Sequence, residues 1–200
     1  MGGDALIMYR PDFDVNRLSG RDRRLFYEWS QLERAFGQGG KIRFEVAECN
    51  SRGLPIKYRV AYHIRSIQGV ERVEALDMPG VSNPPIFASL FLMTITLPDN
   101  YPCVDAPVEF RFLTCDEAGK AIPHPWHPNI RYFGEFAGRV CLNTPDTYAS
   151  LLWGVRRVAL YLRYDLYHAA QHPPYPEDPK VARWVVRQGE PNGWVYFDQN

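Results

Sequence analysis

Alternating hydrophobic and polar positions mark four strand segments in the first 112 residues of the chain. The alternation is clear over 41–48 and stronger over 56–67, as expected of strands with one buried face. The segment 87–97 is apolar on both faces, which is typical of a central strand. A fourth alternating segment covers 108–112. Four consecutive strands with short links predict an antiparallel meander, with one face packed on helices and the other facing water.

Before the first strand, the apolar residues recur every three to four positions instead of every second one. Ser19 with Asp22 three residues later resembles a capping box, with Asp in the place of the usual Glu. Apolar side chains then recur on one face from Leu25 to Phe36, and Gly37 follows. This pattern predicts a helix that begins after Ser19 and ends at Gly37.

Two further helices are predicted in the last quarter of the chain. Apolar residues at helical spacing over 151–166 indicate a core helix, which the proline-rich stretch 172–179 ends. Asp178 stands at an N-cap position, Pro179 at the first helical position, and Gly189 closes a short helix. The fold class expected is therefore α+β, with an N-terminal helix, a four-stranded antiparallel meander and C-terminal helices.

The length and net charge of the chain narrow the possible number of domains and the classes of partner. A chain of 200 residues is one domain of ordinary size, which we place at 19–200 after an N-terminal arm at 1–18. The 23 basic and 23 acidic side chains cancel, so no global field attracts nucleic acid or an anionic membrane. No apolar run approaches the roughly 18 residues needed to span a bilayer. Neither nucleic acid nor membrane is an expected partner.

The cysteines favour a reducing compartment. Cys49, Cys103, Cys115 and Cys141 form no CxxC pair, and the N-terminus lacks a basic region followed by an apolar run, so no signal peptide is expected. A cytoplasmic location is predicted.

Residues that could act as metal ligands or nucleophiles are concentrated in one segment, HPWHPNIRYFGEFAGRVCLN, which begins at His124. Cys141 within it is a metal ligand, a nucleophile or a core thiol. Zinc needs a fourth ligand, and Pro125 and Pro128 keep His124 and His127 off one helical face. No metal is expected, and the phosphate-binding glycine motifs are missing.

Five features in order resemble the ubiquitin-conjugating enzyme family over roughly residues 19–185. They are the helix and meander, a proline turn (Tyr101, Pro102, Pro107), HPNI (His127–Ile130), VCL (Val140–Leu142), and PEDP (Pro176–Pro179) after a core helix. The resemblance implies a carrier that accepts a ubiquitin-like modifier from an activating enzyme as a thioester and passes it to an amine on a target, with or without a ligase. It implies no cofactor, since the activating enzyme uses the ATP.

The resemblance also assigns roles to residues. Cys141 matches the acceptor thiol, Asn129 the amide of the HPN motif beside His127 and Pro128, and Asp178 the acidic residue beside the incoming lysine. This chemistry is sound, because sulfur is both a good nucleophile and a good leaving group. An amide donor stabilises the tetrahedral oxyanion by about 3 to 4 kcal/mol, and a carboxylate positions the amine or accepts its proton.

Each role has a structural alternative. Cysteine is often an inert core thiol, Asn129 also suits a proline-bounded turn, and Asp178 also suits an N-cap. His127 is expected to be an architectural hydrogen-bonding residue. Arg139 is the nearest cation in sequence, so only mild activation of Cys141 is expected.

Some features of the sequence depart from the pattern of eukaryotic ubiquitin-conjugating enzymes. Eleven residues separate Asn129 from Cys141, and the chain ends in the aromatic tail GWVYFDQN. These departures make the chain more similar to the ubiquitin-conjugating-like proteins of bacterial conjugation operons, which implies a role in antiphage defence. The alternative is a non-catalytic scaffold of the same fold that binds a modifier, although such variants typically lack the cysteine.

A basic surface is also expected on the polar side of the sheet. It is either a partner-binding surface, as the resemblance to the family implies, or an ordinary solvated strand face. Glu45 and Glu109 are the only acids expected there. The basic residues are Arg43, Lys57, Arg59, Arg65 and Arg111.

Overall fold

The elements of the computed structural model follow the expected order, with an additional pair of strands. The structure describes residues 9, 11, 14–78, 80–103, 107–142, 150–170 and 172–197. The helices are α1 (Gly20–Phe36), α2 (Leu151–Leu162) and α3 (Pro179–Trp184), with 3₁₀ turns at Val15–Arg17 and Val73–Ala75 and a π-helical turn at Val185–Gly189. The strands are β1 (Ile42–Cys49), β2 (Pro55–Tyr62), β3 (Ser66–Val70), β4 (Pro85–Ala88), β5 (Phe91–Thr96) and β6 (Glu109–Phe112).

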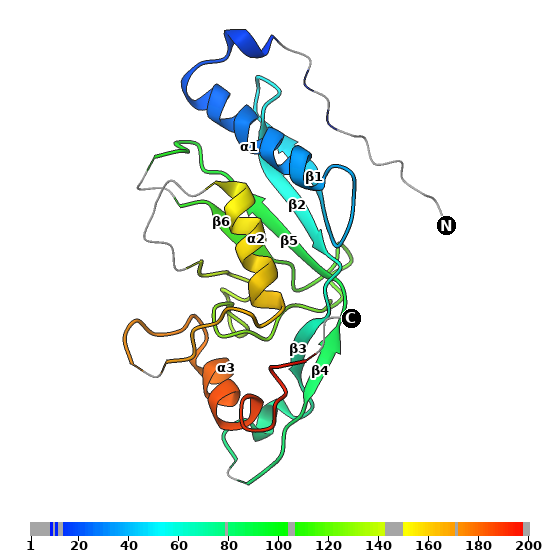
Figure 1. Ribbon diagram of the computed structural model, residues 1–200, viewed down its shortest axis with the longest axis vertical. Coiled ribbons are helices and arrows are strands. Elements are labelled where there is room, and N and C mark those ends of the chain that lie inside the picture. Colours follow the sequence, from blue (N-terminus) through cyan, green and yellow to red (C-terminus); the bar gives the residue numbers. More distant parts are fainter. Residues whose placement is uncertain are drawn as a thin grey trace, which may run out of the picture.

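The predicted antiparallel meander is confirmed. The four-stranded sheet has the order β1-β2-β5-β6, with every neighbouring pair antiparallel (Figure 1). Two predicted strands were too long, because 56–67 divides into β2 and β3 and 87–97 divides between β4 and β5. The strands β3 and β4 pair with each other as a separate two-stranded sheet. The chain therefore leaves the main sheet after β2 and returns to it at β5.

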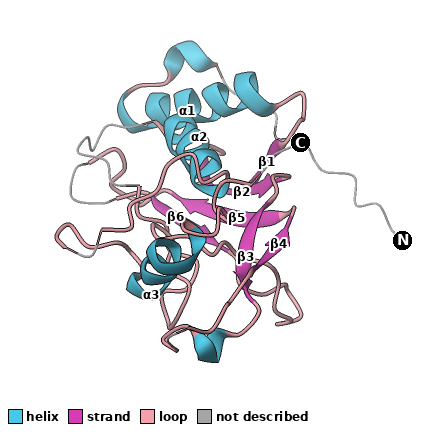
Figure 2. Cartoon of the chain, turned by 60° about the horizontal axis from the view of Figure 1, so that its bottom comes forward, coloured by secondary structure: helices cyan, strands magenta, loops and turns pink. Residues whose placement is uncertain are grey.

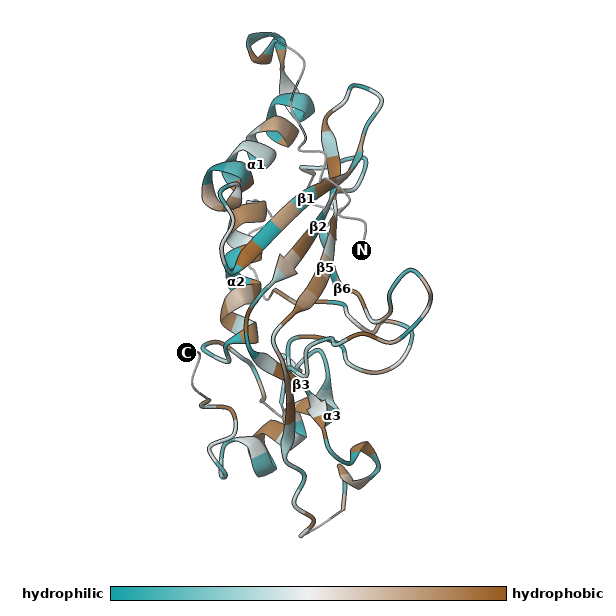
Figure 3. Cartoon of the chain, turned by 90° about the vertical axis from the view of Figure 1, so that its right-hand side faces the viewer, coloured by the Kyte–Doolittle hydropathy of each residue, from teal (hydrophilic) through white to brown (hydrophobic). Residues whose placement is uncertain are grey.

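Helices α1 and α2 cover the same face of the main sheet, as the two turned views show (Figures 2 and 3). Between them and the sheet lies the main core, which we define by Leu25 and Leu32 of α1, Tyr58, Val60, Phe91 and Met93 of the sheet, and Val155 and Val158 of α2. All eight are fully buried. This arrangement confirms the α+β class and the packing of one sheet face on helices.

The start of α1 differs from the capping box expected. Ser19 occupies the N-cap position, but its side chain makes no capping hydrogen bond. Asp22 instead forms an ion pair with Arg52 from the β1–β2 turn. A carboxylate one turn into a helix can serve either partner, and here the tertiary one prevails.

Glu28 is a charged residue that lies fully buried on the core face of α1. One carboxylate oxygen pairs with Arg24 at 2.6 Å and accepts from the Tyr101 hydroxyl at 2.7 Å. The other accepts from the backbone N–H of Leu151 at 2.8 Å, the first residue of α2. This network satisfies the buried charge and fixes α1, the proline turn and the start of α2 relative to one another.

A second hydrophobic cluster lies beside the β3–β4 hairpin. We call it the second cluster and define it by Ile67, Val70, Trp126, Tyr164, Val181, Trp184, Val185 and Val195. Trp126 meets Trp184 edge to face at 6.0 Å between ring centroids, and Trp194 stacks on Trp184 at 6.3 Å. The aromatic tail is thus part of a packed cluster, at least as far as residue 197.

The polar face of the sheet is less basic than expected. Arg59 pairs with Glu45 at 3.3 Å and with Glu117 at 3.7 Å, and Glu117 was not among the acids predicted. Arg111 pairs with Glu109 at 3.6 Å. Arg65 lies over the Phe87 ring at 4.0 Å, between β2 and β3, and is not on the main sheet. The prediction that Glu45 and Glu109 are the only nearby acids is wrong.

Candidate active site

The HPN turn and the cysteine segment lie side by side. The N–H of Cys141 donates to the carbonyl of Asn129 at 2.8 Å, and Ile130 forms an antiparallel bridge with Val140. The intervening loop closes on itself, since the Arg131 N–H donates to the Arg139 carbonyl at 2.8 Å. The long spacer between Asn129 and Cys141 therefore does not separate them.

The same loop is attached to the edge of the main sheet at β6. The Phe112 N–H donates to the carbonyl of Gly138, and the Val140 N–H donates to the carbonyl of Phe110. Gly138 has φ of 88°, and a Cβ there would lie 2.1 Å from the Phe112 carbonyl oxygen. Only glycine fits this approach, so Gly138 holds the cysteine segment against the sheet.

Cys141 is partly exposed, in contrast to a buried core thiol. Its carbonyl accepts a hydrogen bond from the Tyr161 hydroxyl of α2 at 3.2 Å. Burial raises the pKa of Tyr161, although Arg157 opposes this effect, so the hydroxyl stays protonated and remains a donor. The thiol thus sits on a segment fixed by Asn129 on one side and by Tyr161 on the other.

Asn129 is 2% exposed, and its amide has a fixed orientation. The side-chain oxygen Oδ1 accepts the backbone N–H of His168 at 2.8 Å. Because a backbone N–H needs an acceptor, Oδ1 must face His168, and the amide nitrogen Nδ2 must face away from it. Among the described residues Nδ2 has no hydrogen-bond partner. The side chain thus combines a structural acceptor with an available donor.

His127 is a neutral, buried support for this turn. Burial lowers its pKa from the ordinary 6.5 to about 3, although a hydrogen bond to the Leu166 carbonyl opposes the shift. Nδ1 accepts the Asn129 N–H at 3.1 Å, so the ring proton is on Nε2, which lies 3.2 Å from the Leu166 carbonyl. The ring also stacks on Tyr161 at 4.9 Å. These contacts fit the architectural role expected of it.

Pro128, which follows, is buried, and its carbonyl accepts the Asp178 N–H at 3.0 Å.

Asp178 caps α3, as its sequence position predicts. Its Oδ1 accepts from the N–H groups of Lys180 and Val181. Its Oδ2 accepts from the N–H groups of Tyr132 and Phe133, at 3.0 and 3.3 Å. The side chain is 2% exposed. Asp178 therefore joins α3 to the loop that precedes Cys141, and both carboxylate oxygens are occupied by backbone donors.

The cation nearest in sequence to the thiol is already paired. Arg139 forms an ion pair with Glu177 at 2.7 Å, and Arg131 pairs with the same carboxylate oxygen at 3.4 Å. Arg157 reaches the cysteine segment instead, because its Nε donates to the Tyr161 hydroxyl at 3.1 Å. Arg139 is therefore a loop anchor, and Arg157 is the cation linked to Cys141 through Tyr161.

Sequence reasoning missed Tyr161, His168 and Glu177. Tyr161 lies three residues after Val158, at a helical spacing that brings it to the buried side of α2, and that spacing could have identified it. His168 acts through its backbone N–H, so its residue type carries no signal. Glu177 lies one residue before the cap of α3, and nothing local indicates its two arginine partners.

Other kinds of site find no support in the described part of the chain. No cluster of three or more His, Cys, Asp or Glu side chains is arranged there to hold a metal ion. No helix among these residues is both long enough and apolar enough to cross a membrane.

Comparison with known proteins gives likenesses among solved structures. No protein-family model matches the sequence, and no curated protein matches it. A ubiquitin-conjugating enzyme E2 of Plasmodium falciparum superposes with a TM-score of 0.42 and 17% identity, over 70% of this chain and 96% of that one. A putative ubiquitin-conjugating enzyme of Plasmodium yoelii superposes with a TM-score of 0.47 and 18% identity, over 90% and 91%.

Proposed function

We propose that the chain is a conjugating enzyme for a ubiquitin-like modifier, with Cys141 as its acceptor thiol. The observation that carries the proposal is the pairing of a partly exposed cysteine with an oriented asparagine amide across one backbone hydrogen bond of 2.8 Å. The HPNI, VCL and PEDP motifs support the same assignment, because Ile130 bridges to Val140 and the Asp178 N–H donates to the Pro128 carbonyl.

The proposed loading step is a thioester exchange. The Cys141 thiolate attacks the carbonyl that joins the modifier to the activating enzyme, and a new C–S bond forms. The tetrahedral intermediate collapses as the bond to the activating enzyme's sulfur breaks, and that thiolate leaves. The activating enzyme has already used ATP, so this chain needs no cofactor of its own.

Transfer then places the modifier on an amine. A deprotonated amine attacks the thioester carbonyl, and the tetrahedral oxyanion forms. The C–S bond then breaks, the Cys141 thiolate leaves, and the amine nitrogen loses its proton to water. We assign the Asn129 Nδ2 donor to the oxyanion. An acid–base role for Asp178 rests on the family resemblance alone, and its observed contacts favour a positioning role.

A thioester assay tests the proposal. The chain is incubated with ATP, a candidate modifier and its activating enzyme, and the product is resolved with and without a reducing agent. The expected result is an adduct that thiol reagents remove and that Cys141→Ala abolishes. An adduct that survives in Cys141→Ala would overturn the assignment. Failure to load, together with reversible binding of the modifier, would favour the scaffold alternative.

The biological setting is part of the same proposal. The long loop before Cys141 and the aromatic tail support a place in a bacterial antiphage conjugation system. Neighbouring genes for a modifier that ends in glycine and for an adenylating enzyme are the expected observation, and they would also name the partners. A ligase and a protein target would complete the pathway.

A further inference from the structure

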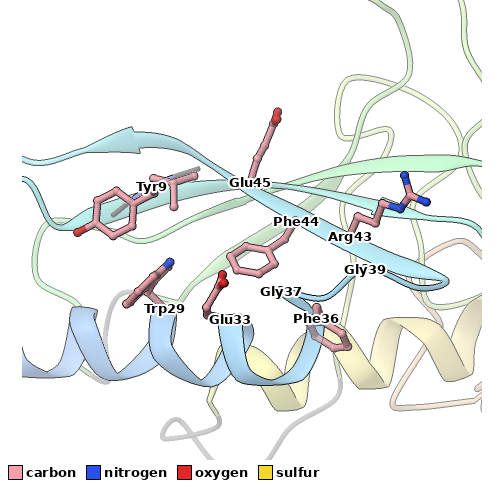
Figure 4. A pocket seen from close by; sticks show the side chains of 10 residues that line it. Tyr9, Trp29, Glu33, Phe36, Gly37, Gly39, Arg43, Phe44 and Glu45 are labelled. Carbon is pink, nitrogen blue, oxygen red and sulfur yellow. The ribbon is translucent and has the colours of Figure 1, made fainter. Parts of the chain in front are cut away.

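The hollow between α1 and β1 is filled by the chain's own N-terminal arm. Tyr9 meets Trp29 edge to face at 5.2 Å between ring centroids, and its hydroxyl donates to the Gly53 carbonyl at 2.8 Å (Figure 4). Glu33 also lines this hollow. The hollow therefore has its occupant, whereas a cation beside Cys141 has no acidic partner among the described residues.

This cation is Arg157, which lies on α2 between two aromatic rings. Its guanidinium carbon is 5.1 Å from the centroid of the Trp153 ring and 5.7 Å from that of the Tyr161 ring. The three residues follow one another at intervals of four, so they share one side of the helix. Stacking against two rings holds the planar guanidinium of this half-buried residue in a defined orientation.

Two hydrogen bonds connect the guanidinium to the cysteine segment. The Arg157 Nε donates to the Tyr161 hydroxyl at 3.1 Å, and that hydroxyl donates to the Cys141 carbonyl at 3.2 Å. Burial raises the pKa of Tyr161, the Arg157 guanidinium lowers it, and a thiolate at Cys141 raises it further. The sulfur and the guanidinium therefore both lie close to this one hydroxyl.

The rest of the guanidinium is unpaired. Within the described part of the chain, Nε is the one nitrogen of Arg157 with a hydrogen-bond partner, and no acid pairs with it. Arg131 and Arg139, by contrast, share the carboxylate of Glu177. A half-buried, oriented guanidinium fork with free N–H groups favours a carboxylate, which can accept two of them at once.

The planar geometry of a thioester places the modifier's tail on the same side. The carbonyl carbon carries the oxygen, the sulfur and the tail, which diverge in one plane. With the oxygen facing Asn129, as in the proposed transfer step, the tail leaves away from Asn129, and Tyr161 fixes the cysteine segment on that other side. An extended tail advances about 3.3 to 3.6 Å per residue, so the third or fourth residue from its end comes within reach of Arg157.

We propose that Arg157 selects modifiers that carry an acidic residue third or fourth from their C-terminal end. Its terminal N–H groups bind that carboxylate while Nε remains on Tyr161. This inference rests on the proposed function, since it requires that Cys141 accepts the modifier. It adds a specificity-determining residue to the site, and the substrate class is a ubiquitin-like modifier with an acidic tail.

Peptide thioesters test the selection without an activating enzyme. The full chain is incubated with acetylated AAEGG or AAQGG, each as its S-phenyl thioester, and mass spectrometry of digests measures acylation of Cys141. The Cys141 sulfur forms a C–S bond with the peptide carbonyl, and thiophenolate leaves. Each rate is divided by the rate at which the same peptide acylates β-mercaptoethanol, because this removes differences in intrinsic reactivity.

The wild-type chain should react about 3- to 10-fold faster with AAEGG than with AAQGG, or with AEAGG than with AQAGG. Arg157→Gln should abolish the preference, and Arg157→Glu should favour the lysine peptide in the same series. Because the compared peptides meet the same thiol, their ratio does not depend on how well a variant positions it. Equal rates for acidic and neutral peptides at both positions in the wild-type chain would overturn the selection.

Arg156 provides the matched control. It is exposed and has no acidic partner among the described residues, and it lies roughly 100° around the helix from Arg157. Arg156→Gln makes the same change in net charge and should retain the preference. An equal loss in Arg156→Gln and Arg157→Gln would show that the peptides sense only the general charge of α2, which contradicts the proposed contact.

Three other results separate this inference from the proposed function. Acylation of the exposed Cys103 and Cys115 without acylation of Cys141 would overturn the acceptor assignment and the inference with it. Acylation of Cys141 without any acid preference would overturn the role of Arg157 alone. A preference that arises only when the AAQGG thioester is discharged to acetylated AKEA rather than AKQA would place the carboxylate on the target and overturn the assignment to the tail.

Discussion

The main core and the second cluster are built in different ways. The main core packs regular elements, so its members recur at strand or helix spacing, as Tyr58 and Val60 do on β2. The second cluster gathers residues from a hairpin, loops, a short helix and the tail, with Ile67 and Val195 near its sequence limits. The first is encoded by periodicity, and the second by large aromatic side chains on irregular segments.

The candidate site lies where the two clusters meet. Trp126, just before the HPN motif, belongs to the second cluster. Ile130, just after Asn129, is buried in the same hydrophobic cluster as the eight residues that define the main core. The motif is thus held from both sides, which explains how an irregular turn keeps a defined geometry. The difference teaches that the regular core supplies the platform, while the aromatic cluster holds the HPN turn on its other side.

The largest effect is expected from removing the centre of the second cluster. Trp184→Ala should lower the free energy of unfolding by about 3 to 5 kcal/mol, since Trp184 is 2% exposed. It should also slow thioester discharge by the folded chain, because Trp126 loses its ring contact. Denaturant unfolding and single-turnover discharge measure the two effects.

Two controls sharpen this comparison. Val186→Ala, at an exposed position near the same helix, should change stability by less than about 0.5 kcal/mol. Leu25→Ala in the main core should cost about 2 to 5 kcal/mol yet leave discharge by the folded fraction unchanged. Equal slowing in Trp184→Ala and Leu25→Ala would contradict the division of labour.

Acid should weaken the junction between the clusters. The pKa of His127 is lowered from 6.5 to about 3 when the chain folds. Between pH 3 and pH 6.5 the unfolded chain binds a proton at His127 that the folded chain does not. The part of the free energy of unfolding that depends on neutral His127 is therefore complete above pH 6.5 and is lost as the pH falls. From pH 7 to pH 5 the loss from His127 should be about 2 kcal/mol. His127→Gln should reduce this dependence, and the exposed His172→Gln should retain it; an identical dependence in His127→Gln would contradict the assignment.

Asp178 joins the second cluster's helix to the cysteine loop, and its substitution should have the next largest effect. In Asp178→Asn, Oδ1 can still cap α3, but an amide N–H₂ would face the N–H groups of Tyr132 and Phe133. The expected cost is about 1 to 3 kcal/mol. Thermal or denaturant unfolding measures it.

Discharge to two amines separates positioning from acid–base chemistry. Lysine is mostly protonated at neutral pH, whereas hydroxylamine is mostly unprotonated. A positioning role predicts that Asp178→Asn slows both nucleophiles equally. Selective slowing of lysine would show that the carboxylate handles the proton.

Tyr161 joins the main-core helix to the same segment, and its effect should be the smallest. Tyr161→Phe keeps the ring on His127 but removes the hydrogen bond to the Cys141 carbonyl. A loss of about 0.5 to 1.5 kcal/mol is expected, with slower thioester formation. Tyr167→Phe removes a hydroxyl bonded to Glu190 and should lose similar stability without slower loading. Equal loading by both variants would show that Tyr161 does not position the thiol.

Periodicity predicted the main sheet and its long helices, and the residue types Asp178 and Pro179 predicted the cap of α3. It could not predict that the strand at 56–67 divides, because burial still alternates through Tyr62, His63 and Ile64 where the chain changes sheets. Nor could it identify Glu28 as a core residue, because a charge on an apolar helical face gains its partners only in the folded state.

The same limit applies to the site. The order of the motifs predicted that Asn129 and Cys141 belong to one site. The hydrogen bonds of the loop between them show how the two residues lie side by side despite the long spacer. The roles of Tyr161, Glu177 and the His168 N–H depend on tertiary contacts between segments far apart in sequence. Such contacts leave no local pattern.

The central claim is that Asn129 supplies an oxyanion donor beside the Cys141 thioester. The most direct test is single-turnover discharge of the preformed thioester in Asn129→Asp, compared with Asn129→Ala. Asp keeps an oxygen for the His168 N–H but lacks the Nδ2 donor, whereas Ala loses both. The account predicts that both variants slow discharge by about 100-fold or more, with Asp retaining more stability than Ala. Discharge at the wild-type rate in Asn129→Asp would show that Asn129 only holds the turn, and it would contradict the claim.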